Sequence, residues 1–176
     1  MEFEKKVLSK ELLALLYESE KTVGTAESCT SGMIAATITH VPGASDYFKG
    51  GIVSYSNDVK VSVLGVDADL IAEKTAVCEE VAIQMVKGAI KTLDVDYAVS
   101  ATGFAGPGCA DGIPVGTIWI ACGNAEKQVS KKLTEDEGRD KNCDNAADEA
   151  MRLLLDFIRE NEPARVGDEV VELTAE

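Results

Sequence analysis

Ser28 is the residue whose setting most clearly suggests chemistry. It lies where a predicted strand, residues 22–26, runs into a predicted helix, residues 31–39. Such junctions carry nucleophiles and bind anions in α/β proteins. A serine becomes a nucleophile when a base removes its proton, and histidine is the usual base. The only histidine, His40, follows that helix and precedes a turn. The sequence favours a surface position for it and leaves a catalytic role open.

Lys60 offers Ser28 a base of another kind. Serine–lysine pairs work without histidine when the lysine pKa is lowered by burial or by a neighbouring cation. Lys60 follows a second predicted strand, residues 50–56, and lies in the first turn of a helix that Asn57 or Asp58 caps. If the two strands are parallel neighbours, both junctions open on one edge of the sheet. The alternative, from spacing alone, is a solvated helix lysine.

Three neighbours of this pair have two interpretations each. Glu27 either orients Ser28 or Lys60, or caps the following helix. Cys29 is either a rival nucleophile, because a thiolate is stabilised at a helix N-terminus, or a small buried residue. Tyr55 ends the second strand and either passes a proton or binds substrate, or simply packs. We expect backbone amides just after Ser28 to form an oxyanion hole.

A glycine-rich loop follows a third predicted strand, residues 96–102. The loop is Thr102-Gly103-Phe104-Ala105-Gly106-Pro107-Gly108. Glycines after a strand let backbone N–H groups approach an anion closely. The sequence matches neither a Walker loop, which needs Gly-Lys-Ser/Thr, nor a Rossmann fingerprint. By itself the loop therefore indicates either a phosphate or oxyanion site, or an ordinary turn.

Helical and strand patterns alternate along the chain. Further helices are predicted at residues 4–21, 67–74, 78–93 and 140–160, and further strands at residues 115–122 and 128–133. The pattern predicts an α/β fold, a three-layer α/β/α sandwich around a mixed, mostly parallel sheet. We expect one domain over residues 1–162, followed by an acidic C-terminal tail, residues 163–176.

Charge and cysteine usage narrow the class of protein. The 176-residue chain has a formal net charge of −14, which argues against nucleic-acid binding because that needs a basic surface. No apolar run approaches about 20 residues, so no membrane span is predicted, and no signal-peptide core follows Met1. The five widely spaced cysteines indicate free thiols in a reducing compartment, and a metal site is not expected. We expect a cytoplasmic protein.

Several motifs, in order along the chain, resemble the C-terminal domain of the competence-damage-inducible CinA proteins. They include TAESCTSG from Thr25, VPGAS from Val41, GGIVSYSNDVK from Gly50, TGFAGP from Thr102 and PVGT from Pro114. Standalone members of that family are nicotinamide-nucleotide amidases. The resemblance therefore implies an amidohydrolase that converts nicotinamide mononucleotide to nicotinate mononucleotide and ammonia without a metal or organic cofactor. It also implies a dimer or larger homo-oligomer.

The resemblance implies roles for individual residues as well. Ser28 is the nucleophile, Lys60 is its base, and Tyr55 lies close to both. The glycine-rich loop helps to hold the nucleotide. With these roles we assign substrate binding to Glu27, Cys29, Thr30, Ser31, Gly32, Asn57, Thr102, Gly103, Phe104, Ala105, Gly106 and Arg139.

The chain departs from the family pattern at four places. Ser31 replaces the first glycine of S-C-T-G-G, and Cys78 stands where serine is usual. Residues 109–111 replace further glycines, and Asp111 there repels a phosphate unless it points away. Residues 141–143 replace a region where a second arginine is common. The chemistry is therefore better supported than the substrate. The alternatives are a nucleotide-binding module without deamidase activity and a serine amidase for another small amide.

Overall fold

The computed structural model describes residues 2–17, 19–108 and 112–162. The predicted acidic tail, residues 163–176, lies outside the described residues. In chain order the elements are α1 (Glu2–Leu16), β1 (Val23–Glu27), α2 (Met33–Ile38), the 3-10 turn η1 (Ala44–Asp46), β2 (Phe48–Val53), α3 (Asn57–Leu64), α4 (Ala68–Lys74), α5 (Glu79–Leu93), β3 (Tyr97–Phe104), β4 (Thr117–Gly123), β5 (Gln128–Leu133) and α6 (Arg139–Asn161).

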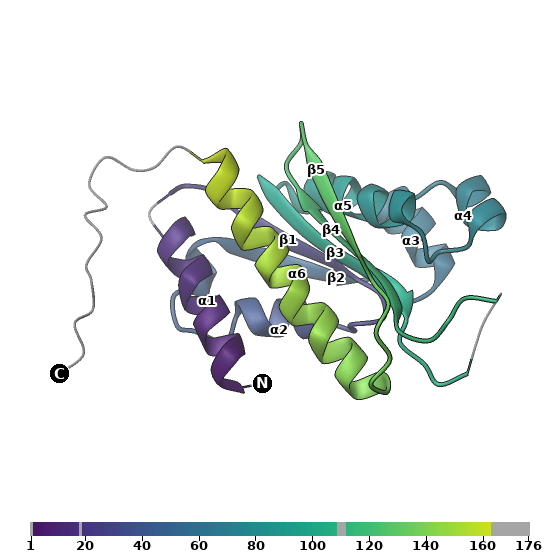
Figure 1. The fold of residues 1–176 in the computed structure, drawn as a ribbon. Helices are drawn as coiled ribbons and strands as arrows, with labels where there is room; N and C mark the ends of the chain where they lie inside the picture. The colour runs from purple at the N-terminus through teal and green to yellow at the C-terminus, as the bar shows by residue number, and fades with distance from the viewer. Residues whose placement is uncertain (1, 18, 109–111, 163–176) are drawn as a thin grey trace.

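The described strands form one five-stranded sheet in the order β2-β1-β3-β4-β5 (Figure 1). β1 pairs in parallel with β2 and with β3, whereas β3–β4 and β4–β5 are antiparallel pairs. Two reversals return β5 to the direction of the first three strands, so only β4 runs the other way. The predicted mixed, mostly parallel sheet is confirmed. β1 lies between β2 and β3, which brings three strand ends together at one edge.

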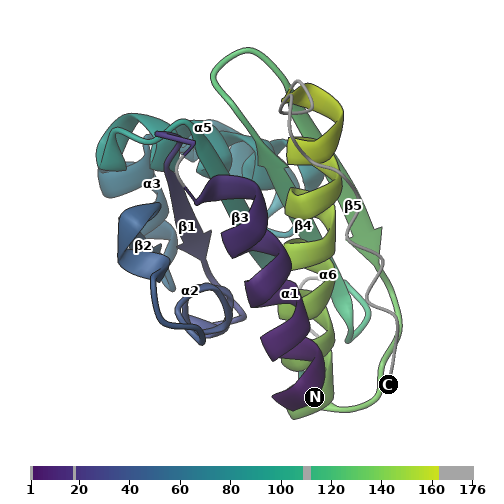
Figure 2. The same ribbon diagram turned by 90° about the vertical axis from the view of Figure 1, so that its left-hand side faces the viewer.

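Helices cover both faces of the sheet, as Figures 1 and 2 show. α1, α2 and α6 pack together on one face, and α3 and α5 lie on the other. Alternate residues of β3 serve the two layers: Val99 and Ala101 belong to the core beneath α6, and Ala98 to the core beneath α5. The predicted α/β/α sandwich is confirmed by this division of the core.

Several predicted element boundaries were wrong, among them the end of the second strand, predicted at residue 56 and found at Val53, and two of them have a clear local cause. The first helix, expected to reach residue 21, ends at Leu16, where the Ser19 backbone N–H and hydroxyl both bond to the Leu16 carbonyl. The helix that contains Lys60 is capped by Ser56 and by neither Asn57 nor Asp58. The Ser56 hydroxyl accepts a hydrogen bond from the Val59 N–H at 3.4 Å. Both corrections reflect local hydrogen bonds that short polar side chains make with the backbone.

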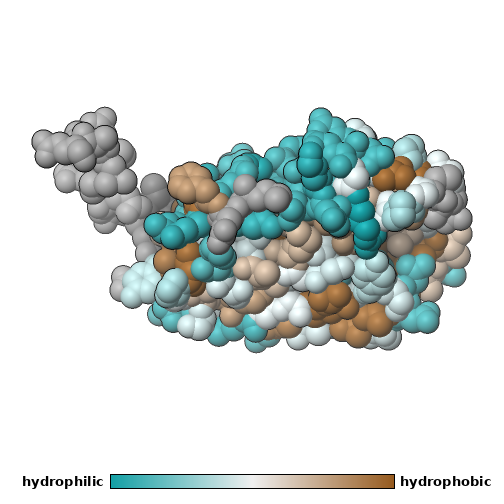
Figure 3. All heavy atoms as spheres, turned by 90° about the horizontal axis from the view of Figure 1, so that it is seen from below, coloured by the Kyte–Doolittle hydropathy of each residue, from teal (hydrophilic) through white to brown (hydrophobic). Residues whose placement is uncertain are grey.

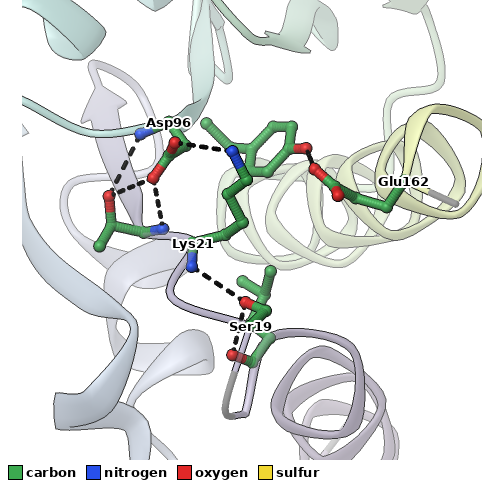
Figure 4. Close-up of polar contacts among 7 residues, drawn as sticks. Ser19, Lys21, Asp96 and Glu162 are labelled. Carbon is green, nitrogen blue, oxygen red and sulfur yellow. Dashed lines mark hydrogen bonds and ion pairs between the residues drawn. The ribbon is translucent and has the colours of Figure 1, made fainter. Parts of the chain in front are cut away.

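A polar network joins the starts of β1 and β3, at the opposite edge from the converging strand ends (Figure 4). The Asp96 carboxylate accepts hydrogen bonds from the Thr22 N–H at 2.9 Å, the Thr22 hydroxyl at 3.0 Å and Lys21 Nζ at 3.2 Å. The Tyr97 hydroxyl donates to Glu162 near the end of α6. These bonds hold this edge of the sheet through side chains.

On the molecular face drawn in Figure 3, hydrophobic residues form separate patches among hydrophilic ones. Within the described ranges, no helix has the length and apolar character needed to cross a membrane.

Candidate active site

The ends of β1, β2 and β3 meet at one edge of the sheet and carry the predicted site. Ser28 directly follows β1, and its N–H donates to the Ala101 carbonyl of β3 at 2.9 Å. The Ser54 N–H, just after β2, donates to the Glu27 carbonyl at 2.8 Å. These cross-strand bonds fix the three strand ends relative to one another before any helix is considered.

Lys60 Nζ lies 2.9 Å from Ser28 Oγ, which is within hydrogen-bond distance. Nζ also lies 2.8 Å from the Ser54 carbonyl oxygen and 3.4 Å from that of Tyr55. Lys60 is only 2% exposed, and none of the ion pairs among the described residues includes it. Burial lowers the pKa of Lys60 from its ordinary value, so the amine loses its proton more readily than a surface lysine does.

The short helix α3 is held in a way that places Lys60 inward. Gly65 ends the helix in the left-handed conformation, with φ +67°, and the Val66 N–H donates to the Lys60 carbonyl at 3.1 Å. On α5, Gly88 leaves room for the Leu64 carbonyl, since an added Cβ would stand 2.0 Å from that oxygen. Close contact between α3 and α5 therefore depends on a glycine far from the strand ends.

Glu27 caps α2 and makes no hydrogen bond with Ser28 or Lys60. One of its oxygens accepts from the Thr30 hydroxyl at 2.8 Å, the Gly32 N–H at 2.9 Å and the Ile34 N–H at 3.1 Å. The other oxygen accepts from Ala35 N–H at 2.9 Å. Because Glu27 and Thr30 are fully buried, we withdraw the assignment of these two side chains to substrate binding. The structure favours the capping interpretation of Glu27.

Cys29 is a weaker nucleophile than Ser28 in this setting. Its side chain is buried, and burial raises the pKa of its thiol to about 12. A thiol with such a pKa is not the thiolate that attacks carbonyl groups. His40 is exposed and lies past the end of α2, whereas Lys60 lies within hydrogen-bond distance of Ser28.

The turn after Ser28 frees backbone donors. Ser31 has φ +52°, in the left-handed region that favours glycine, so the serine keeps the turn that glycine makes in the family pattern. The Ser31 N–H donates to the Ser28 carbonyl at 3.1 Å, and Gly32 donates to Glu27. Among the described residues, the Thr30 N–H has no acceptor, and the Cys29 N–H has none beyond its own thiol. Thr30 is fully buried and Cys29 is 6% exposed, so the Cys29 N–H is the better candidate for an oxyanion donor.

Arg139, the first residue of α6, joins the ends of β2 and β3. Its Nη1 donates to the Gly106 carbonyl at 2.6 Å, and its Nη2 donates to the Tyr55 hydroxyl at 3.1 Å. The hydrogen bond to Tyr55 raises the pKa of Arg139, which keeps the guanidinium charged. Tyr55 is 58% exposed, and its hydroxyl makes no hydrogen bond with Lys60 or Ser28 in the described structure. Its carbonyl oxygen, by contrast, lies near Nζ.

Within the glycine-rich loop only Pro107 and Gly108 are exposed. The Thr102 hydroxyl donates to the Ala76 carbonyl at 2.8 Å, and Gly103 packs where an added Cβ would stand 2.6 Å from Ile118. These contacts hold the start of the loop to its neighbours, and substrate contact at Thr102 and Gly103 stays a prediction. Gly106 has φ +96°, which favours glycine. Residues 109–111, including Asp111, lie outside the described residues.

Two hollows lie on either side of these loops. One, of about 400 Å³, is lined by Asn57, Phe104 and residues of the α4–α5 connection, and it borders the strand ends. The other, of about 450 Å³, lies between β5 and α6. Neither Ser28 nor Lys60 lines either hollow, but the one beside Asn57 is the better candidate for a substrate, because Phe104 at the end of β3 and Asn57 at the start of α3 line it.

Sequence reasoning missed two residues of α6 that contact these loops. The Asn142 amide donates to the Ala105 carbonyl at 3.1 Å, and Cys143 Sγ donates to the Cys29 carbonyl at 3.2 Å. Both follow Arg139 at the helical spacings i+3 and i+4, which place them on the same face. This helical spacing from Arg139 is the sequence signal that could have pointed to these two residues.

Comparison with known proteins places the chain in a family. The model of the CinA C-terminal domain matches residues 5–158. The chain belongs to the CinA C-terminal domain family. A CinA-like protein from Leptospira borgpetersenii is 48% identical over 123 residues, covering 68% of this chain and 29% of the relative. A CinA-like protein from Flavobacterium psychrophilum is 40% identical over 148 residues, covering 84% of this chain and 35% of the relative.

Solved structures of CinA proteins share the fold. The competence damage-inducible protein A from Klebsiella pneumoniae matches with a TM-score of 0.86 at 28% identity, over 90% of this chain and 99% of that one. A competence/damage inducible protein from Agrobacterium tumefaciens matches with a TM-score of 0.84 at 30% identity, over 88% and 95%. The chain spans about a third of the length of the curated CinA relatives it matches.

Proposed function

We propose that this CinA-family chain is an amidohydrolase in which Ser28 is the nucleophile and Lys60 is the base. The 2.9 Å contact between Ser28 Oγ and Lys60 Nζ is the observation that carries the proposal. It is supported by the burial of Lys60, which favours the neutral amine that a base must be. The family resemblance supplies the same two residues by an independent route.

In the structure Lys60 Nζ donates to Ser28 Oγ and to the carbonyls of Ser54 and Tyr55, which matches the three donors of an ammonium. When the amine loses a proton, it keeps two N–H donors and gains a lone pair. The two carbonyls then hold the two N–H groups, so the lone pair faces the Ser28 hydroxyl. The Ser28 proton then moves to Nζ as Oγ bonds to the amide carbon. No carboxylate has to orient the base, because two backbone carbonyls do so.

The remaining steps follow from the same geometry. The Cys29 N–H stabilises the negative oxygen of the tetrahedral intermediate. Nζ returns the proton to the departing nitrogen, so the C–N bond breaks and ammonia leaves an acyl-serine. Water then attacks the acyl carbon as Nζ takes one of its protons. Nζ passes this proton to Ser28 Oγ as the acyl–oxygen bond breaks, and the released acid loses its own proton to solvent as the carboxylate. Proton and electron pairs balance over the cycle, and each step uses a group within the described site.

We propose nicotinamide mononucleotide as the substrate and nicotinate mononucleotide as the product. The CinA family resemblance supports this choice. The charged Arg139 and the glycine-rich loop beside it suit an anionic group. The proposal includes assembly as a dimer or larger homo-oligomer in the cytoplasm, without nucleic-acid or membrane partners, and a single domain over residues 1–162. The assembly, the location, the absence of these partners and the domain bounds rest on the family resemblance and on the sequence.

A second candidate is a serine amidase that acts on another small amide. The packed roles of Thr102 and Gly103 favour it, because fewer loop residues are left for a nucleotide. Comparing the nucleotide with its dephosphorylated riboside separates the two candidates. A pocket that binds phosphate prefers the nucleotide strongly, whereas a small-amide site does not.

Ammonia release from nicotinamide mononucleotide tests the proposal directly. We expect Ser28→Ala to lower kcat by at least about 10³-fold, because the nucleophile is lost while binding contacts stay. Ser62→Ala is the matched control, since it removes an exposed hydroxyl on α3 and should leave kcat unchanged. Undiminished turnover by Ser28→Ala would overturn the mechanism. Nucleotide binding by calorimetry with no ammonia release would favour a binding module instead.

A further inference from the structure

Three side chains on one face of the first turn of α6 each donate to a backbone carbonyl. Arg139 binds the Gly106 carbonyl at 2.6 Å, Asn142 the Ala105 carbonyl at 3.1 Å and Cys143 the Cys29 carbonyl at 3.2 Å. We call Arg139, Asn142 and Cys143 the carbonyl clamp. It contacts the loops after β1 and β3, which flank the Ser28–Lys60 pair.

A carbonyl that is held in place also fixes the N–H of the same peptide, because the two point in opposite directions in a trans peptide. The Ala105 carbonyl shares its peptide with the Gly106 N–H, which has no acceptor among the described residues. Asn142 thus holds the carbonyl on the α6 side and leaves the Gly106 N–H directed away from the helix. This is the arrangement by which backbone amides bind anions.

At the β1 end, both peptides that flank Cys29 are held by their carbonyls. The Ser31 N–H holds the Ser28 carbonyl at 3.1 Å, and Cys143 holds the Cys29 carbonyl. The backbone conformation of Cys29, and with it the direction of its N–H, is therefore fixed from two sides. Burial raises the pKa of the Cys143 thiol, so it stays protonated and remains a donor.

Asn142 is itself firmly held. It is 3% exposed, its amide nitrogen also donates to Asp136 Oδ1 at 3.0 Å, and its oxygen accepts from the Glu137 N–H at 2.8 Å. A side chain fixed at both its oxygen and its nitrogen can hold a loop without losing much further conformational entropy.

We propose that Asn142 and Cys143 are positioning residues with separable effects. Asn142 directs the Gly106 N–H toward the anionic group of the substrate, and Cys143 holds the Cys29 backbone so that its N–H meets the oxyanion. Neither residue touches the reacting atoms. This proposal rests on the proposed function for its kinetic test, and a second test below is independent of the substrate.

The kinetic test measures kcat and KM separately for nicotinamide mononucleotide. We expect Asn142→Ala to raise KM about tenfold with kcat little changed, because one buried hydrogen bond to the loop is lost. We expect Cys143→Ala to lower kcat about threefold with KM unchanged, since S–H donors are weak. Cys143→Ser should recover kcat, because its hydroxyl still donates.

Two control variants show whether the loss of a polar group elsewhere changes the kinetics through structural damage alone. Asn145→Ala removes an exposed amide on the same helix, and Cys122→Ala removes a buried thiol that donates to the Leu153 carbonyl at 3.4 Å, away from the strand ends. Both should leave kcat and KM unchanged. Equal changes of kcat and KM in Asn142→Ala and Cys143→Ala would overturn the proposal, since general loosening of the fold acts on both.

Labelling of Ser28 by a fluorophosphonate makes the second test independent of the amide substrate. Ser28 Oγ attacks phosphorus, fluoride leaves, and the developing negative oxygen needs the same oxyanion donor. We expect slower labelling in Cys143→Ala and wild-type labelling in Asn142→Ala. Wild-type protein that labels but releases no ammonia would count against the proposed function alone. Labelling rates identical in all variants, or no labelling of wild type, would count against the positioning role.

Discussion

Two lysines near opposite edges of the sheet show how this fold treats the same side chain differently. Lys21 lies beside the start of β1, where its Nζ bonds to Asp96 and its side chain is 41% exposed (Figure 4). Lys60 lies in α3, just past the end of β2, and is 2% exposed. A serine and two backbone carbonyls surround its Nζ. Lys21 therefore has a carboxylate partner and is exposed to solvent, whereas Lys60 has no carboxylate partner among the described residues and is almost fully buried.

The pKa values of the two amines move in opposite directions as a result. The hydrogen bond and charge of Asp96 raise the pKa of Lys21, whereas burial lowers that of Lys60. A lysine that holds strand ends together works best charged, and one that removes a proton works only when neutral. The comparison teaches that position within the sheet, rather than residue type, separates structural from chemical lysines here.

The largest expected effect tests the Lys60 side of the comparison. Lys60→Met should lower kcat/KM for the amide by about 10²–10⁴-fold, because a general base is removed while the side-chain volume is kept. Lys21→Met is the matched control and should leave kcat/KM unchanged. An active Lys60→Met would show that another group is the base.

The pH dependence of wild type sharpens the same test. kcat/KM should rise with pH as Lys60 loses its proton and level off below the ordinary pKa of 10.5, because the folded pKa is lowered. In the same window the unfolded chain binds more protons than the folded one, so the free energy of unfolding also rises with pH. Lys60→Met should lose this rise, which urea titrations at several pH values can measure.

A smaller effect is expected at Glu27, which separates capping from catalysis. Glu27→Gln places an amide N–H against donors and weakens four hydrogen bonds, so the free energy of unfolding should fall by roughly 2–4 kcal/mol. Urea titration measures this loss. Glu80→Gln, at the exposed start of α5, is the matched control and should change stability little. A stable but inactive Glu27→Gln would give Glu27 a direct role in the reaction.

The smallest effect is expected from Asp96, on the structural side of the comparison. Burial opposes its charge, but hydrogen bonds from Thr22 and from Lys21 together lower the pKa of Asp96. A lowered carboxyl pKa stabilises the fold above the unfolded pKa and loses this effect as pH falls through the folded one. Asp96→Asn should therefore cost about 1 kcal/mol at neutral pH, a cost that shrinks in acid, with kcat unchanged. Loss of activity in Asp96→Asn would instead indicate that the network at the strand starts influences the site at the opposite edge of the sheet.

The sequence predicted the order of the elements from local signals, because small and polar residues mark strand ends. The meeting of Ser28 with Lys60 was left open by spacing, which also allowed a solvated lysine, and was predicted through the family resemblance. The direction in which the Thr102 side chain points was not predictable from the sequence. Its hydroxyl turns to the Ala76 carbonyl only because β3 packs on α5 with alternate side chains facing that helix.

Residues whose role depends on contacts between distant segments were the hardest to assign. Glu27 had two equal interpretations, and only the folded backbone of α2 decides between them. Cys143 lies 114 positions from the carbonyl that it holds, so no local pattern indicates the contact. The helical spacing from Arg139 marks a shared face, but what that face meets depends on the packing of α6.

The buried thiol of Cys29 has a consequence for how the protein withstands oxidants. Peroxides react with thiolates, and a thiol whose pKa is raised to about 12 is almost wholly protonated at neutral pH. Serine does not undergo this oxidation. The proposed site on Ser28 and Lys60, with its adjacent sulfur shielded, should therefore keep its reacting atoms intact under oxidants that inactivate cysteine hydrolases.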